Sequence, residues 1–172
     1  ELFSAWASDP ENDFNTVFHR TVEDVHPPLY QILLWGIYKV FGYGEMVGRV
    51  FSVVLGVAVI PMMYVLGRKL YCVEVGLLAA LFSAINFFLI VFSQNTRSYE
   101  ILVLLTVVSF VLFFDLVKKR KFSTALWYAV ACAALVNTHY FGFLPVMSQA
   151  IFLIYLSCWP RFDRRLFVLG GG

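Results

Sequence analysis

Charged side chains are scarce in this sequence of 172 residues, where Asp, Glu, Lys and Arg make up 14% of the total, against roughly 25% in soluble domains. Hydrophobic residues make up 60%, and the mean hydropathy is +0.78. A soluble globule of this length could not bury so much apolar surface. Intrinsic disorder is excluded too, since it needs low hydrophobicity and high net charge. A protein that crosses the membrane several times is the class that remains.

Several familiar chemical signatures are also missing. The three cysteines, Cys72, Cys132 and Cys158, lie far apart and form no C-x-x-C, which argues against a zinc ribbon or a redox pair. There is no P-loop, G-x-G-x-x-G, H-E-x-x-H or G-x-S-x-G, so nucleotide-driven transport and metalloprotease chemistry have no support. A net charge of +2 is too small to predict a partner among nucleic acids.

Long uncharged stretches predict an all-α integral membrane protein, a multi-pass helical bundle. A helix needs about 20 apolar residues to cross a bilayer, and the 39 uncharged residues at 122–160 are enough for two, divided by a turn at 137–142. We predict five spans, at 46–67, 74–93, 99–117, 122–138 and 142–158. Asn86, in the middle of the second, is expected to hydrogen-bond to another helix.

The positions of the cations predict the orientation. Nine of the 13 Lys and Arg follow the first, third and fifth predicted spans: Arg68, Lys69, Lys118, Lys119, Arg120, Lys121, Arg161, Arg164 and Arg165. By the positive-inside rule that side is cytoplasmic. Three parts follow: residues 1–44 as a first outer loop, residues 45–160 as the bundle, and residues 161–172 as a cytoplasmic loop with the start of a further segment.

Two helices are predicted in the outer loop. Residues 28–41 are apolar but reach only about 21 Å as a helix, short of the roughly 30 Å core, so we expect them to lie in the outer interface with Tyr30, Trp35 and Tyr38 as anchors. Residues 9–25 are more polar, and their apolar residues recur at roughly helical spacing, which predicts an amphipathic helix.

Polar side chains gather on the predicted outer side, where cations could hold a phosphate and carboxylates or imidazoles could move a proton. Each candidate has a simpler alternative. Arg49 could pair with Glu45 at i,i+4, and Arg97 could pair with Glu100 at i,i+3 or reach lipid headgroups. His26, before two prolines, could only shape a loop, and His139 beside Tyr140 could only be an interfacial residue.

Six motifs in a fixed order resemble a known family. They are H-P-P-L-Y at 26–30, G-R-V-F-S-V-V-L-G at 48–56, Y-V-L-G-R-K-L at 64–70, G-L-L-A-A at 76–80, F-S-Q-N-T-R-S-Y at 92–99 and T-H-Y-F-G at 138–142. Together they resemble bacterial and archaeal membrane glycosyltransferases of the protein O-mannosyltransferase and aminoarabinose-transferase type. The resemblance implies the N-terminal part of the C-type glycosyltransferase fold.

The resemblance also implies a reaction and a site. Such enzymes move a sugar from a polyprenyl-phosphate carrier to an acceptor on the extracytoplasmic face of the plasma (inner) membrane. Glu1 matches the second acid of a family pair that acts as a general base or binds a divalent cation, and no other cofactor is implied. Arg49, Arg97 and His26 match residues near the donor phosphate, and His139 and Tyr140 match a turn beside the same cavity.

The sequence departs from the family pattern in two ways. Asn95 stands where the family often has Glu, and family members usually run to several hundred residues. Because the sequence begins with Glu1 and stops within an apolar stretch, we expect the N-terminal part of a longer protein, inactive alone. The competing hypothesis is a non-enzymatic membrane protein that binds or transports the lipid-linked sugar at the same interface.

Overall fold

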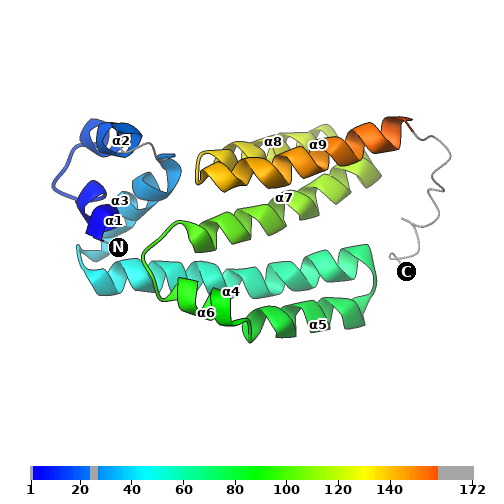
Figure 1. The fold of residues 1–172 in the computed structure, drawn as a ribbon, viewed down its shortest axis with the longest axis horizontal. Helices are drawn as coiled ribbons and strands as arrows, with labels where there is room; N and C mark the ends of the chain where they lie inside the picture. The colour runs from blue at the N-terminus through cyan, green and yellow to red at the C-terminus, as the bar shows by residue number, and fades with distance from the viewer. Residues whose placement is uncertain (1, 24–26, 159–172) are drawn as a thin grey trace.

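The computed structural model describes residues 2–23 and 27–158, and its regular elements there are all helices (Figure 1). They are α1 (Leu2–Ala7), α2 (Phe14–Glu23), α3 (Leu29–Phe41), α4 (Glu45–Leu70), α5 (Val73–Ala84), α6 (Phe87–Ser93), α7 (Tyr99–Lys119), α8 (Phe122–Val136), the 3-10 helix η1 (Tyr140–Gly142) and α9 (Phe143–Cys158). The small group α1–α3 lies at one end of an elongated bundle. In the bundle, α7 lies between the α4–α5 pair and the α8–α9 pair.

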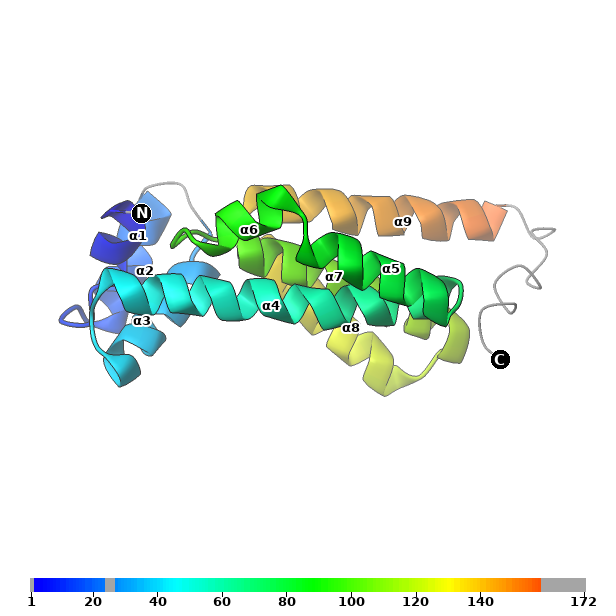
Figure 2. The same ribbon diagram turned by 90° about the horizontal axis from the view of Figure 1, so that it is seen from below.

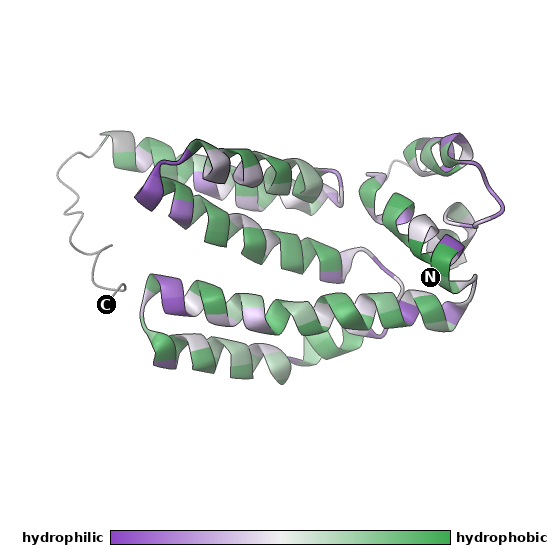
Figure 3. Ribbon diagram, turned by 180° about the vertical axis from the view of Figure 1, so that it is seen from behind, coloured by the Kyte–Doolittle hydropathy of each residue, from purple (hydrophilic) through white to green (hydrophobic). Residues whose placement is uncertain are grey.

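Among the described residues, two helices are long and apolar enough to cross a membrane, α4 with 26 residues and α7 with 21. A third span is formed if α5 and α6, which meet at a bend of 55°, cross together. The apolar helices α8 and α9 are shorter, with 15 and 16 residues. The five predicted ranges overlap these elements, while the division into an outer loop and a bundle stays a prediction. Figure 3 shows apolar residues along the bundle and polar colours concentrated toward its ends.

The break between α5 and α6 corrects one prediction. Asn86 does not bond to another helix: its side-chain oxygen accepts the backbone N–H of Leu89 at 3.2 Å and so caps the first turn of α6. Capping satisfies an orphan N–H of the new helix. Figure 2 shows α6 turning away from the line of α5.

The burial of α3, in the small group α1–α3, also differs from the prediction. Tyr30 and Tyr38 are 1% and 2% exposed and pack with Leu34 and Ile101, which joins α3 to α7 and to the partly buried face of α4. They are therefore core residues, and their predicted role as interfacial anchors is wrong. Trp35 is half-buried, and its indole N–H donates to the carbonyl oxygen of Asn12 at 3.1 Å.

Polar contacts tie the long helices together at two levels. At the end rich in cations, Lys69 of α4 bonds to Asp115 of α7 at 2.5 Å, and Lys119 reaches the same carboxylate at 3.2 Å. Within the bundle, the buried Gln149 of α9 donates to Ser109 of α7 at 3.0 Å and accepts from the hydroxyl of Tyr128 of α8 at 2.8 Å. Such hydrogen bonds hold helices together where no water competes.

Candidate functional site

The two predicted arginines lie on segments that are in contact through the side chain of Thr96. A Cβ added at Gly48 would lie 2.7 Å from Cγ2 of Thr96, so the turn between α6 and α7 rests directly on α4. Gly48 immediately precedes Arg49, and Thr96 immediately precedes Arg97. The structure therefore brings the segments of both arginines to the same end of α4, beside the small group α1–α3.

The two arginines differ in their surroundings. Arg49 lies on the first turn of α4, and its guanidinium pairs with Glu45 at 2.6 Å, as the i,i+4 spacing predicts. Arg97 is exposed, and the structure shows no pair between its side chain and Glu100 within residues 2–23 and 27–158. Of the two simpler alternatives for Arg97, the i,i+3 pair is therefore wrong, because Glu100 is buried in the bundle while Arg97 is exposed.

His139, from the predicted turn at 137–142, lies next to the start of α7, close to the turn of Arg97. Its Nδ1 accepts the backbone N–H of Phe141 at 3.2 Å, which caps η1, and its ring lies 5.9 Å from the ring of Tyr99. The rings of Tyr99 and Phe92 lie 4.9 Å apart. This row of rings joins the end of α6, the start of α7 and η1. Tyr140, next to His139, is 58% exposed.

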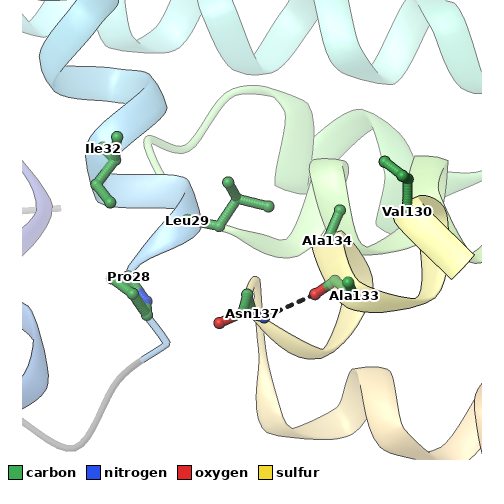
Figure 4. Close-up of a pocket in the computed structure, with 7 residues that line it drawn as sticks. All are labelled: Pro28, Leu29, Ile32, Val130, Ala133, Ala134 and Asn137. Atoms are coloured by element: carbon green, nitrogen blue, oxygen red, sulfur yellow. Dashed lines mark hydrogen bonds between the residues drawn. The ribbon is translucent and has the colours of Figure 1, made fainter.

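A backbone hydrogen bond brings two distant motifs together. The N–H of Leu29, at the start of α3, donates to the carbonyl oxygen of Asn137, at the end of α8, at 3.0 Å. An open groove of about 390 Å³ lies between these two helices (Figure 4). It is lined mainly by apolar side chains, from Pro28, Leu29, Ile32, Val130, Ala133, Ala134 and Asn137. The groove runs from the turn beside His139 along the apolar side of α8.

Two predicted site residues, Glu1 and His26, lie outside the described residues. Within residues 2–23 and 27–158 no three His, Cys, Asp or Glu side chains gather where they could hold a metal ion. A divalent cation at Glu1 therefore stays a prediction, and we build no chemical step on one.

The buried position of Glu100 was not predicted from the sequence. Its spacing suggests a partner for Arg97, but it is 0% exposed, and neither of its carboxylate oxygens has a hydrogen-bond partner among the described residues. The residue that makes room for the Glu100 carboxylate is Gly56, on α4: a Cβ there would lie 3.0 Å from Oε2 of Glu100. One sequence does not reveal that such a glycine and such an acid meet.

Comparison with known proteins identifies the family. A family model described as dolichyl-phosphate-mannose-protein mannosyltransferase matches residues 25–172. The chain belongs to this family. It is thus a member of a multi-pass membrane family of glycosyltransferases that use a lipid-linked sugar. No curated protein and no solved structure matches the chain.

For a member of this mannosyltransferase family, the end of the bundle next to α1–α3 has suitable chemistry. A guanidinium offers several N–H donors to phosphate oxygens, and it stays charged at any physiological pH. Arg97 is exposed there. The apolar groove ends at Asn137, two residues before His139, whose ring lies 5.9 Å from that of Tyr99. The arrangement can hold a ligand with an anionic head and an apolar tail.

Proposed function

We propose that the protein transfers a sugar from a polyprenyl-phosphate carrier to an acceptor hydroxyl on the extracytoplasmic face of the membrane. The observation that supports this most directly is the contact between Gly48 and Thr96, since it gathers the segments of Arg49 and Arg97 at the end of the bundle opposite the ion pair Lys69–Asp115. The positive-inside rule makes that opposite end the outer one.

The reaction needs a phosphate-binding cation. As the bond between the sugar C1 and the phosphate oxygen breaks, the electron pair stays on the phosphate, and negative charge grows there. A guanidinium that faces this oxygen stabilises the growing charge. Arg97 suits this role best, because the charge of Arg49 is already partly balanced by Glu45 at 2.6 Å.

The acceptor needs a base. Its hydroxyl oxygen forms the new bond to C1 and gives up its proton, which a carboxylate can take. Glu1 is our candidate for this base, on the family resemblance alone.

The apolar groove between α3 and α8 suits the carrier's hydrocarbon tail. Its lining is apolar except near Asn137, and burial of each CH₂ group contributes about 0.8 kcal/mol. The phosphate of a tail held there would lie near the turn that contains His139. The ring of His139 is next to that of Tyr99, which follows the turn of Arg97.

The test is donor consumption by the protein in nanodiscs. A panel of polyprenyl-phosphate sugars is incubated with the wild type and with Glu1→Gln, and free carrier phosphate is measured. We expect release by the wild type and none by Glu1→Gln. The matched control is Glu11→Gln, which removes an exposed outer acid and leaves release unchanged. Donor binding without release in wild type and variant would contradict the transferase and favour a carrier-binding or transport protein.

A further inference from the structure

One face of α4 lets polar groups enter the apolar bundle. Gly48, Ser52 and Gly56 follow one another at four-residue spacing, so they lie on one side of the helix over about 12 Å. Gly48 receives Thr96 and the hydroxyl of Tyr38, both within 3 Å of where a Cβ would stand. Ser52 is fully buried. A larger side chain at any of these positions would close this face.

The carboxylate of Glu100 is aimed at the inner end of this face. A Cβ at Gly56 would lie 3.0 Å from Oε2 of Glu100 and 3.0 Å from Cβ of Ser93. Glu100 is 0% exposed, and both its oxygens are buried without a hydrogen-bond donor. An ionised carboxylate in apolar surroundings is very unfavourable unless a positive charge accompanies it.

No basic side chain of the described residues supplies that charge. Arg97 is exposed, Arg49 pairs with Glu45, and Lys69 pairs with Asp115 at the far end of the bundle. α6 carries no titratable side chain. The other titratable and charged groups on the packed helices α3, α4 and α7 are Tyr30, Tyr38, Lys39, Tyr64, Arg68, Tyr99, Lys118 and Lys119. Lys39 stacks on Trp35, Arg68 and Lys118 are exposed, and none of these groups bonds to the carboxylate.

The serine hydroxyls of this part of α4 and α6 do not donate to the carboxylate, because both bond within their own helices. The Ser52 hydroxyl donates to the carbonyl oxygen of Gly48 at 3.3 Å, and the Ser93 hydroxyl donates to that of Ile90 at 2.8 Å. Their protons are thus engaged within their own helices. In addition, Ser93 is the last residue of α6, and the C-terminal end of a helix carries partial negative charge. The surroundings of Glu100 therefore favour a small positive charge, as broken helices do in other membrane proteins.

We propose that the buried carboxylate of Glu100 binds one small monovalent cation, either a proton or an alkali-metal ion. The site is closed by Gly56 of α4 and Ser93 of α6. The proposal does not depend on glycosyl transfer, since it rests on burial and contacts alone. Glu100 lies three residues after Arg97, so an occupied site would also hold the turn of Arg97 against α4 as a positioning element.

Infrared difference spectroscopy of the protein in nanodiscs tests this. The spectrum of Glu100→Gln is subtracted from that of the wild type at neutral pH, in choline chloride, sodium chloride and potassium chloride. Choline is included because it is too large to replace a small ion at a fully buried carboxylate. A protonated carboxyl gives a C=O stretching band that shifts in D₂O, whereas a carboxylate gives the two bands of the ionised group.

Three outcomes are distinguishable. A protonated-carboxyl band of Glu100 that is the same in all three salts identifies the proton as the ligand. A band present in choline and replaced by carboxylate bands in sodium or potassium identifies an alkali-metal ion. Carboxylate bands in all three salts would overturn the proposal, because Glu100 would then be ionised without a small cation.

Two variants keep the experiment decisive. Glu23→Gln removes an exposed acid of α2, so its difference spectrum should show carboxylate bands only and calibrates the method. If Glu100→Gln fails to fold, Glu100→Asp retains the carboxyl group, and its subtraction from the wild type should show the same band displaced rather than lost.

Discussion

Gly48 and Thr96 touch because residue 48 has no side chain. A Cβ at this position would stand 2.7 Å from Cγ2 of Thr96 and 2.7 Å from the hydroxyl oxygen of Tyr38. Real Cβ atoms do not approach other atoms so closely, so the turn, α3 and α4 can meet here only around a glycine. This single contact sets the position of the Arg97 segment relative to the Arg49 segment.

Replacing Gly48 with alanine should therefore displace the turn. We expect Gly48→Ala to destabilise the protein by about 1–3 kcal/mol, the range for an overpacked contact, measured as a lower midpoint of thermal unfolding in detergent. The matched control is Gly36→Ala, in the middle of α3, where a Cβ would meet nothing within 4 Å. It should stabilise by about 0.4–1 kcal/mol, since alanine costs less chain entropy than glycine. Equal effects at the two positions would contradict the packing argument.

The exposed arginine should matter more for donor binding than the paired one. A hydrogen bond to a charged group contributes about 1.5–3 kcal/mol, so Arg97→Gln should weaken donor binding roughly 10- to 100-fold. Arg49→Gln should have a smaller effect, because its charge is partly balanced by Glu45. Affinity is measured by titrating a polyprenyl-phosphate sugar in nanodiscs.

The control for the arginines is Arg120→Gln, which removes an exposed charge near the opposite end of the bundle. It should leave donor affinity unchanged. An Arg97→Gln protein that binds the donor as tightly as Arg120→Gln would remove Arg97 from the proposed phosphate site.

The helical, membrane-spanning character could be predicted from the sequence because it depends on composition and on the length of apolar runs. The Glu45–Arg49 pair followed in the same way from local spacing. Contacts between distant segments could not be predicted: the apolar pattern of residues 28–41 fits an interfacial helix as well as one that buries Tyr30 and Tyr38 against α7 and α4. The approach of Glu100 to Gly56 likewise depends on how α7 packs on α4, which no local pattern specifies.

The bend between α5 and α6 should depend on the capping side chain of Asn86. Loss of an N-cap oxygen costs roughly 0.5–2 kcal/mol, so Asn86→Ala should lower the unfolding midpoint, and Asn86→Ser, which keeps a neutral capping oxygen, should largely preserve it. Ser98 is the N-cap residue of α7 but makes no capping hydrogen bond, so Ser98→Ala serves as the control with little expected change. A destabilisation of Ser98→Ala as large as that of Asn86→Ala would show that capping is not the cause.

The buried amide of Gln149 should hold three helices together. It donates to Ser109 at 3.0 Å and accepts from Tyr128 at 2.8 Å, so Gln149→Leu keeps a side chain of similar size but removes both bonds. Hydrogen bonds between membrane helices contribute about 0.6 kcal/mol each on average and up to about 1.7. We therefore expect a loss of about 1–2 kcal/mol in unfolding free energy.

Ser148→Ala is the control. It changes the exposed neighbour on α9, whose hydroxyl bonds only within its own helix in the described structure, and should cost little. If Tyr128→Phe added its full effect to Gln149→Leu, the two residues would be independent, whereas a shared hydrogen bond predicts a double variant only slightly less stable than Gln149→Leu alone.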